Sequence, residues 1–249
     1  RATGEIVHVL QCGLEVDEGW TVAAMRRFDA TAIAAVSPQL FSRQDPSSVT
    51  TGVSYTPGGL RRLCSTKTRA EIGRDPDMLG PTLQAGFYRR DAVQDVGGVD
   101  DRVGETLADV DLAMALLAAG YRTVHEPSSR VHGSEPRAIE RDGFQEARRQ
   151  ERFFWKHPPM PTWHRSLVAH LLLVIAETVF PIPRPPGLRR LFGRLLGCVE
   201  AATRRKSAKQ PGHPRVPRPR NAAARSASAS RDTILTTQRG AARRERHVA

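Results

Sequence analysis

Residues 106–127 constrain the fold more than any other part of the chain. Apolar residues recur at the spacing of one helix face over residues 107–119, and Gly120 stands where such a helix would end. Residues 121–125 then have a strand pattern, which we expect Pro127 to terminate. A helix followed directly by a strand indicates an α/β domain.

The residues before this segment alternate between short strand and helix patterns. Strands are predicted over residues 5–10, 30–36 (ending at Pro38) and 83–88, and helices over residues 22–28 and 91–96, the latter ended by Gly97 and Gly98. Residues 42–80 are rich in Ser, Thr, Gly, Pro and Asp, and we expect a loop region there with one hairpin. These patterns predict an α/β mixed sheet with flanking helices up to about residue 135.

The character of the sequence changes after His132. A charged helix is predicted over residues 145–156. The apolar run 166–180 has about 15 residues, fewer than the roughly 20 that a helix needs to cross a bilayer. Residues 187–202 place leucines on one face and arginines on the other, the pattern of a basic amphipathic helix at a membrane surface. From Arg204 onward large apolar residues are scarce, and we expect disorder.

These patterns divide the chain into an α/β part (residues 1–135), a helical membrane-associating region (136–205) and a basic disordered tail (206–249). The first 132 residues carry 14 Lys and Arg against 17 Asp and Glu, whereas the rest carry 24 against 9. A basic half of this kind indicates an anionic partner, either phospholipid or nucleic acid. The three cysteines lie far apart, which fits neither a disulfide framework nor a zinc site and indicates a reducing compartment.

Three blocks of the α/β part carry a specific order of features. Residues 3–20 are a strand and a turn that ends in Gly-Trp. Residues 86–103 contain Arg-Arg followed by Gly-Gly and two aspartates, and residues 108–127 contain Asp-x-Asp-Leu, a helix, Ala-Gly-Tyr-Arg and a strand. In this order the blocks resemble the C-terminal part of the catalytic domain in family 2 glycosyltransferases, which are Rossmann-like nucleotide-diphospho-sugar transferases of the GT-A fold.

This resemblance implies a function as well as a fold. The family pattern places a nucleotide-binding half before Arg1, so we expect the chain to be a fragment. The implied reaction is an inverting hexosyl transfer from a nucleotide sugar to a lipid-linked or polysaccharide acceptor of the cell envelope. With the basic helical region, this implies a peripheral protein at the cytoplasmic face of the cell membrane.

The resemblance also places the general base at Asp109. A sugar hydroxyl that attacks an anomeric carbon loses its proton as the bond forms, and a carboxylate within hydrogen-bonding reach can accept it. Asp109 also stands three residues after Thr106, an approximate capping box in which the acidic side chain would stabilise the helix start. The two roles can coexist.

Other residues of the blocks are candidates for binding. Arg89 and Arg90 are candidates to face a diphosphate, the alternative being a solvated pair at a strand end. Gly86 and Asp111 are candidates to contact donor or acceptor, and the alternative for Asp111 is local structural support or a place in solvent. His132 is a candidate metal ligand by resemblance, the alternative being a packed or exposed histidine.

The first block departs from the family at the metal site. The Asp-x-Asp of relatives is replaced by Gln11, Cys12 and Gly13, so the carboxylate that helps to hold Mg²⁺ or Mn²⁺ on the diphosphate is missing. A single neutral Cys is a poor ligand for a hard cation. The family therefore implies a metal that these three residues do not support, and Glu15 or Asp17 are the nearby carboxylates that can substitute.

Three functions remain open from the sequence. The first is the glycosyltransferase reaction, and the second is a catalytically inactive relative that binds a glycan or a partner, favoured by the lost carboxylates. The third is nucleic-acid binding through the basic tail. The tail lacks interleaved aromatic residues and residues 187–202 have an apolar face, so we expect lipid rather than nucleic acid.

Overall fold

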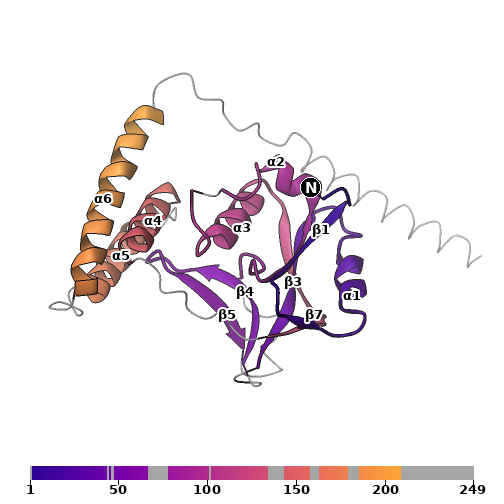
Figure 1. The fold of residues 1–249 in the computed structure, drawn as a ribbon. Helices are drawn as coiled ribbons and strands as arrows, with labels where there is room; N and C mark the ends of the chain where they lie inside the picture. Colours follow the sequence, from indigo (N-terminus) through magenta and orange to yellow (C-terminus); the bar gives the residue numbers. More distant parts are fainter. Residues whose placement is uncertain are drawn as a thin grey trace, which may run out of the picture.

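The computed structural model describes residues 2–43, 45, 48–66, 78–100, 102–133, 143–157, 163–178 and 185–208. In chain order the elements are β1 (Ile6–Leu10), β2 (Glu15–Val16), α1 (Trp20–Arg27), β3 (Ile33–Ser42), β4 (Val49–Tyr55), β5 (Arg61–Thr66), β6 (Ala85–Arg89), α2 (Arg90–Asp95), α3 (Ala108–Ala118), β7 (Arg122–Gly133), α4 (Gly143–Lys156), α5 (Trp163–Thr178) and α6 (Pro185–Ala208). The predicted α/β fold with a mixed sheet, flanking helices and a following helical region is confirmed (Figure 1).

Strand β3 is the centre of the sheet. It pairs antiparallel with β6 near its start and with β4 near its end, and it pairs parallel with β7 along most of its length. The remaining pairs, β1 with β6, β2 with β7 and β4 with β5, are antiparallel. The pair of β3 with β7 is the one parallel pair among the described strands, and it makes the sheet mixed; β4, β5, β6, α2 and α3 lie between these two strands in the chain.

The predictions that one strand ends at Pro38 and another at Pro127 were wrong. Both β3 and β7 continue through their prolines, Pro38 and Pro127. The register between the strands shifts there: Pro38 is opposite Glu126, whereas the next residue of β3 is opposite Arg130. Strand β7 therefore has extra residues at this point, and a bulge accommodates a proline without breaking a regular ladder.

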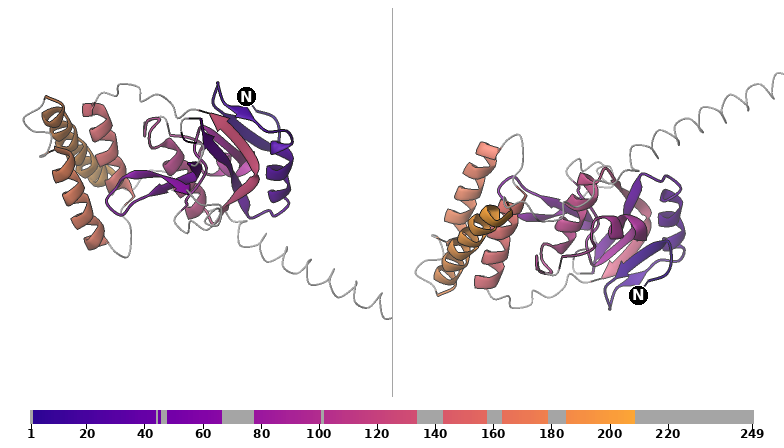
Figure 2. Two further views of the ribbon diagram at one scale, coloured as in Figure 1. Left: turned by 90° about the horizontal axis from the view of Figure 1, so that it is seen from below. Right: turned by 90° about the horizontal axis from the view of Figure 1, so that it is seen from above.

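Helices cover both faces of the sheet, as period-two alternation in the strands requires. Val36 and Phe87 face α1, while their neighbours Ala35 and Tyr88 face α2 and α3. Figures 1 and 2 show α1 on one side of the sheet and α3 on the other. Helix α3 packs on this core through Leu112 and Leu116, and through Val110 on a third cluster formed with β4 and α4, so it is fixed from two sides.

The region predicted as a loop contains the predicted hairpin. Strands β4 and β5 form it, paired from Val49 opposite Thr66 to Tyr55 opposite Arg61 with a register shift between Thr50 and Gly52. Residues 67–77 lie outside the described part of the chain. The hairpin extends from the sheet toward α4, α5 and α6 in all three views (Figures 1 and 2). The hairpin is the part of the sheet that reaches helices α4, α5 and α6, which together we call the helical layer.

The helical layer is held together by close contact between α4 and α6. A Cβ at Gly193 would overlap the Phe144 carbonyl oxygen, and one at Gly197 would lie 2.7 Å from the Arg148 carbonyl oxygen. Two glycines one turn apart thus let the two backbones touch. Of the described helices, none is both long and apolar enough to span a membrane. The tail from residue 209 onward, where disorder was predicted, lies outside the described residues.

Candidate functional site

The candidate site is centred on the first turn of α3, where Asp109 lies. Its side chain is only 3 % exposed, and its Oδ1 accepts a hydrogen bond from the backbone N–H of Val110 at 2.9 Å. The helix has no side-chain cap, and the Thr106 hydroxyl donates to Glu146 of α4 instead. The capping box that the sequence offered as an alternative is therefore not formed, and the carboxylate is held by other groups.

The principal partner of Asp109 is Arg61, the first residue of β5. Its Nε lies 3.0 Å from Oδ1 and its Nη2 lies 2.7 Å from Oδ2 of the carboxylate, which is a two-pronged charge-assisted pair. The Arg61 side chain is about one quarter exposed, so Arg61 lies between the buried carboxylate and the solvent. Sequence reasoning missed Arg61, because it belongs to the region read as a loop and lies 48 positions from its partner.

A tyrosine lies on the core side of this pair. Tyr88 of β6 is buried, and burial, with a further contribution from the charge of Asp109, raises the pKa of its hydroxyl far above the ordinary value. The phenol therefore stays neutral at any physiological pH. Gly86, two residues earlier, leaves room for the ring of Pro81, since a Cβ at Gly86 would lie 2.8 Å from the Pro81 Cβ.

The second carboxylate of the motif, Asp111, connects α3 to the end of α4. Its Oδ1 lies 2.8 Å from the Lys156 Nζ and 3.0 Å from the His157 Nε2. Burial by itself would raise the pKa of Asp111, but the hydrogen bonds and charges of His157 and Lys156 outweigh it and lower the pKa. In this arrangement Asp111 supports the packing of α3 on α4; its role in binding donor or acceptor stays a prediction.

The turn that replaces the metal motif follows β1. Gln11, Cys12 and Gly13 are exposed, and Gly13 has φ +90°, a conformation that favours glycine. Beyond the turn, Asp17 Oδ1 lies 2.9 Å from the Nε2 of His132 on β7. The structure thus joins the candidate ligand His132 to a nearby carboxylate.

These donors do not fit a Mg²⁺ or Mn²⁺ site. The described residues contain no group of three or more His, Cys, Asp or Glu side chains that could hold a metal ion. The pair of Asp17 and His132 supplies one carboxylate, and Glu15 beside it forms an ion pair with Arg43. An amide, a neutral thiol and a glycine at positions 11–13 do not complete the oxygen-rich shell that these cations need.

Arg89 and Arg90 lie at the opposite end of β6. Arg89 is paired in register with Ile6 at the start of β1, whereas the motif turn follows the other end of β1. The Arg89 guanidinium donates to the Phe28 carbonyl at 2.6 Å and to Glu5 at 2.6 Å, and Arg90 donates to a backbone carbonyl near the N-terminus. Both side chains hold the start of the chain on the sheet, and contact with a diphosphate stays a prediction.

Comparison with known proteins found similarity in solved structures. No protein-family model and no curated protein matches the sequence. A mannosyltransferase from Pyrobaculum calidifontis, solved with GDP-mannose and Mn²⁺, matches with a TM-score of 0.38 and 17 % identity over 94 % of this chain and 56 % of that one. GalNAc-T7, solved with UDP, GalNAc and Mn²⁺, matches with a TM-score of 0.42 and 11 % identity over 73 % of this chain and 41 % of that one. Both are glycosyltransferases. This chain spans about half the length of these proteins, and at such identities the likeness concerns the fold.

Proposed function

We propose that this chain is the acceptor-side part of a glycosyltransferase that uses a nucleotide-sugar donor. The observation that carries the proposal is the convergence of the three sequence blocks. Strand β1 of the first block pairs with β6 of the second, and β2 of the first pairs with the end of β7, a strand that begins in the third block. Helix α3 of the third block packs on Tyr88 of the second through Leu112 and Leu116. Segments about 100 residues apart in the sequence thus come together in one sheet and the helix that packs on it.

In the proposed reaction an acceptor hydroxyl attacks the anomeric carbon of the donor. The new carbon–oxygen bond forms as the bond to the diphosphate breaks, so the electron pair leaves with the nucleoside diphosphate and the anomeric centre inverts. The hydroxyl proton passes to Asp109. The proposed acceptor is a lipid-linked sugar or a polysaccharide, in keeping with the resemblance of the blocks to family 2 enzymes.

Arg61 has a defined place in this proposal. A carboxylate that accepts hydrogen bonds from a guanidinium on both oxygens is a poor base. Arg61 must therefore release at least one oxygen of Asp109 before proton transfer. A guanidinium beside the base is also suited to neutralise the negative charge of a departing diphosphate. The positive charge of Arg61 does not depend on a bound metal, so it does not require the metal-binding carboxylates that the first block lacks.

A second candidate function is binding of a glycan or nucleotide sugar without turnover. The specific observation in its favour is that the described carboxylates of the site are already paired: Asp109 with Arg61, Asp111 with Lys156 and Asp17 with His132. Paired carboxylates stabilise a fold whether or not a reaction takes place.

The test uses the full-length protein and a panel of nucleotide sugars, with Mg²⁺, Mn²⁺ or chelator. Donor hydrolysis and transfer are measured beside donor binding by equilibrium dialysis. Asp109→Asn should lower turnover by about 10²- to 10⁴-fold and leave donor binding within a few-fold, while Asp29→Asn at an exposed position should change neither. Donor binding without turnover would support the binding module instead. If no donor is bound under any condition, both functions are wrong.

A further inference from the structure

The polarity of α5 is inverted relative to a helix of a water-soluble domain. Its two most buried residues are Ser166 and His170, which are polar. Five of its eight large apolar residues are exposed, and Leu172 is 62 % exposed. A surface helix in water normally buries its apolar stripe and exposes its polar one. Helix α5 therefore presents its apolar side to something other than the interior of this chain.

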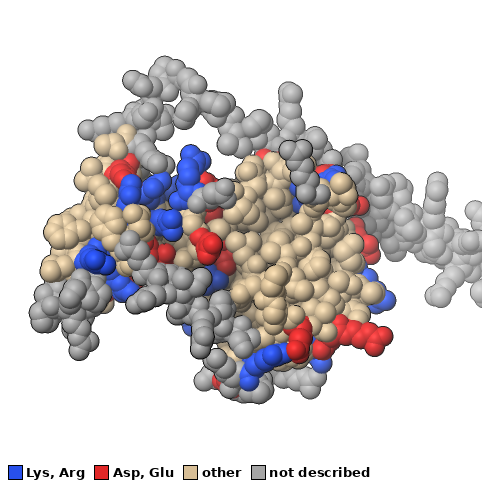
Figure 3. Space-filling model, viewed as in Figure 1, with Lys and Arg blue, Asp and Glu red and all other residues tan. Residues whose placement is uncertain are grey.

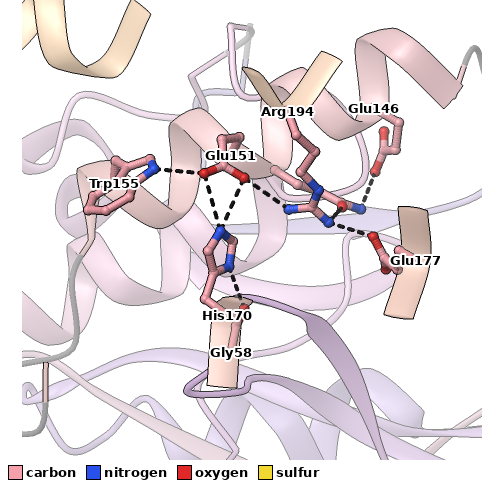
Figure 4. Close-up of polar contacts among 8 residues, drawn as sticks. Gly58, Glu146, Glu151, Trp155, His170, Glu177 and Arg194 are labelled. Carbon is pink, nitrogen blue, oxygen red and sulfur yellow. Dashed lines mark hydrogen bonds and ion pairs between the residues drawn. The ribbon is translucent and has the colours of Figure 1, made fainter. Parts of the chain in front are cut away.

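A charged network fills the inner side of the helical layer (Figure 4). The Nδ1 of His170 lies 2.7 Å from the Gly58 carbonyl oxygen, and its Nε2 lies 3.1 Å from Glu151 of α4. A carbonyl oxygen only accepts, so the Nδ1 of His170 donates to Gly58. Arg194 of α6 donates to the same carboxylate and to Glu177 of α5. Charges are thus satisfied inside the layer rather than in solvent.

Helix α6 adds to the outward apolar face. Phe192 is 62 % exposed, while the opposite side carries the glycines that contact α4. Together α5 and α6 hold ten of the sixteen exposed large hydrophobic residues in the described part of the chain, so the apolar surface is concentrated there. These are Trp163, Val168, Leu171, Leu172, Ile175, Leu188, Phe192, Leu195, Leu196 and Val199. We call this set the outer face.

The charges around the outer face have one sign. Arg165 lies in the first turn of α5, and Arg189 and Arg190 lie in the N-terminal part of α6; all three are exposed. The acidic residues of these two helices are Glu177 and Glu200, and both are engaged by arginines of the layer. In Figure 3 the side of the molecule where α6 lies shows broad uncharged areas, with Lys and Arg and a smaller number of Asp and Glu among them. An apolar face with basic residues at its edges complements an anionic lipid surface.

We propose that the outer face of α5 and α6 docks on the surface of an anionic lipid bilayer. The 16 residues of α5 extend about 24 Å, less than the roughly 30 Å hydrocarbon core, so the helix lies along the interface rather than across it. A second copy of the chain is a weaker fit, because it would bring the same exposed arginines toward one another. The proposal is independent of whether the α/β part transfers a sugar.

The test is flotation of the full chain with vesicles of phosphatidylcholine alone or with 30 mol % phosphatidylglycerol, at low and physiological salt. Binding to the anionic vesicles should exceed binding to the neutral ones by at least tenfold. Leu172→Glu and Phe192→Glu, at well-exposed positions, should each weaken it by about tenfold or more. The matched control Val22→Glu, on the 54 % exposed Val22 of α1, should leave it unchanged. Arg189→Gln with Arg190→Gln should lower anionic binding by roughly fivefold per residue.

Three outcomes would overturn the proposal. Equal binding to neutral and anionic vesicles would remove the role of the arginines. Anionic binding that survives Leu172→Glu and Phe192→Glu would assign it to other basic residues of the chain. Self-association in sedimentation velocity that Phe192→Glu abolishes, with no vesicle binding, would assign the outer face to a second copy.

Discussion

The guanidinium of Arg61 donates hydrogen bonds to both oxygens of the Asp109 carboxylate, at 3.0 and 2.7 Å. The pair joins the first residue of β5, a strand at the edge of the sheet, to the first turn of α3, a helix that packs on the sheet's centre. Its carboxylate is almost fully buried, and its guanidinium reaches toward the surface. The same contact therefore bears on the stability of the fold and on the reactivity proposed for Asp109.

A double-mutant cycle on this pair should show strong coupling. Among the described residues, Arg61→Met leaves the buried Asp109 carboxylate with the Val110 N–H as its hydrogen-bond donor, and we expect a loss of about 2–4 kcal/mol in the free energy of unfolding. Asp109→Asn should cost a similar amount, and the double mutant should lose less than the sum of the two. Urea unfolding followed by circular dichroism measures all four proteins.

The control for this cycle is Arg62→Met, which removes the same charge from the exposed neighbouring residue. It should change the unfolding free energy by no more than about 0.5 kcal/mol. Additive effects of Arg61→Met and Asp109→Asn would mean that the pair is not formed in solution. In that case Asp109 is free to act as a base without any movement of β5.

The buried carboxylate of Glu151 should make the helical layer sensitive to acid. Burial by itself would raise its pKa, but the hydrogen bonds from His170 and Trp155 and the charges of His170 and Arg194 lower it below the usual 4.5. A carboxyl group with a depressed folded-state pKa contributes stability that is complete above about pH 4.5 and is lost as the pH falls through the folded-state value.

The measurement is the unfolding free energy between pH 7 and pH 3. Glu151→Gln should cost about 3 kcal/mol at pH 7, because it leaves buried cations without their partner. It should also flatten the fall in stability below pH 4.5, whereas Glu18→Gln, at an exposed position, should keep the wild-type slope. An unchanged slope in Glu151→Gln would show that other carboxyl groups control the acid transition.

The elements with a strong local period could be predicted from the sequence. The predicted helix 107–119 is α3 (Ala108–Ala118), and the predicted strand 5–10 is β1. Local spacing was sufficient because each element buries one regular face on the sheet. The ends at Pro38 and Pro127 were predicted wrongly, since a proline rule assumes a regular ladder and the two prolines stand together at a bulge.

The partners of the candidate residues were beyond sequence reasoning. Arg61 and Asp109 are 48 positions apart, and His132 and Asp17 are 115 apart, so no local pattern connects them. Such pairs depend on which strands become neighbours, which only the tertiary fold decides. The one available signal was chemical: a buried carboxylate at a helix start needs a donor, and an arginine is the usual one.

Gly193 and Gly197 of α6 should be required for its contact with α4. Alanine favours helix formation over glycine by about 1 kcal/mol, yet Gly193→Ala and Gly197→Ala introduce a Cβ against the α4 backbone. We expect each to destabilise the protein by about 1–3 kcal/mol. Gly4→Ala, where the nearest atom is 3.4 Å from the added Cβ, is the control and should be nearly neutral. A gain in stability for either α6 variant would mean that the two helices are farther apart in solution.

The helical layer and the candidate site both contact the hairpin of β4 and β5, so a substitution in the layer should change the stability of the site. His170 of α5 donates to the Gly58 carbonyl in the turn between β4 and β5, and β5 begins with Arg61, three residues later. His170→Leu removes this donor and the charge that faces Glu151. We therefore expect the turn to loosen and Arg61 to hold Asp109 less firmly.

Hydrogen–deuterium exchange measures this directly. In His170→Leu the amides of residues 56–63 should exchange at least tenfold faster, together with those at the start of α3, while α1 on the far side of the sheet keeps its protection. His164→Leu, at an exposed position of the same helix, should leave the hairpin unchanged. Faster exchange confined to α5 would show that the stability of the site is not coupled to that of the helical layer. Faster exchange at the start of α3 would mean that an event at the outer face can alter the group proposed to accept the proton.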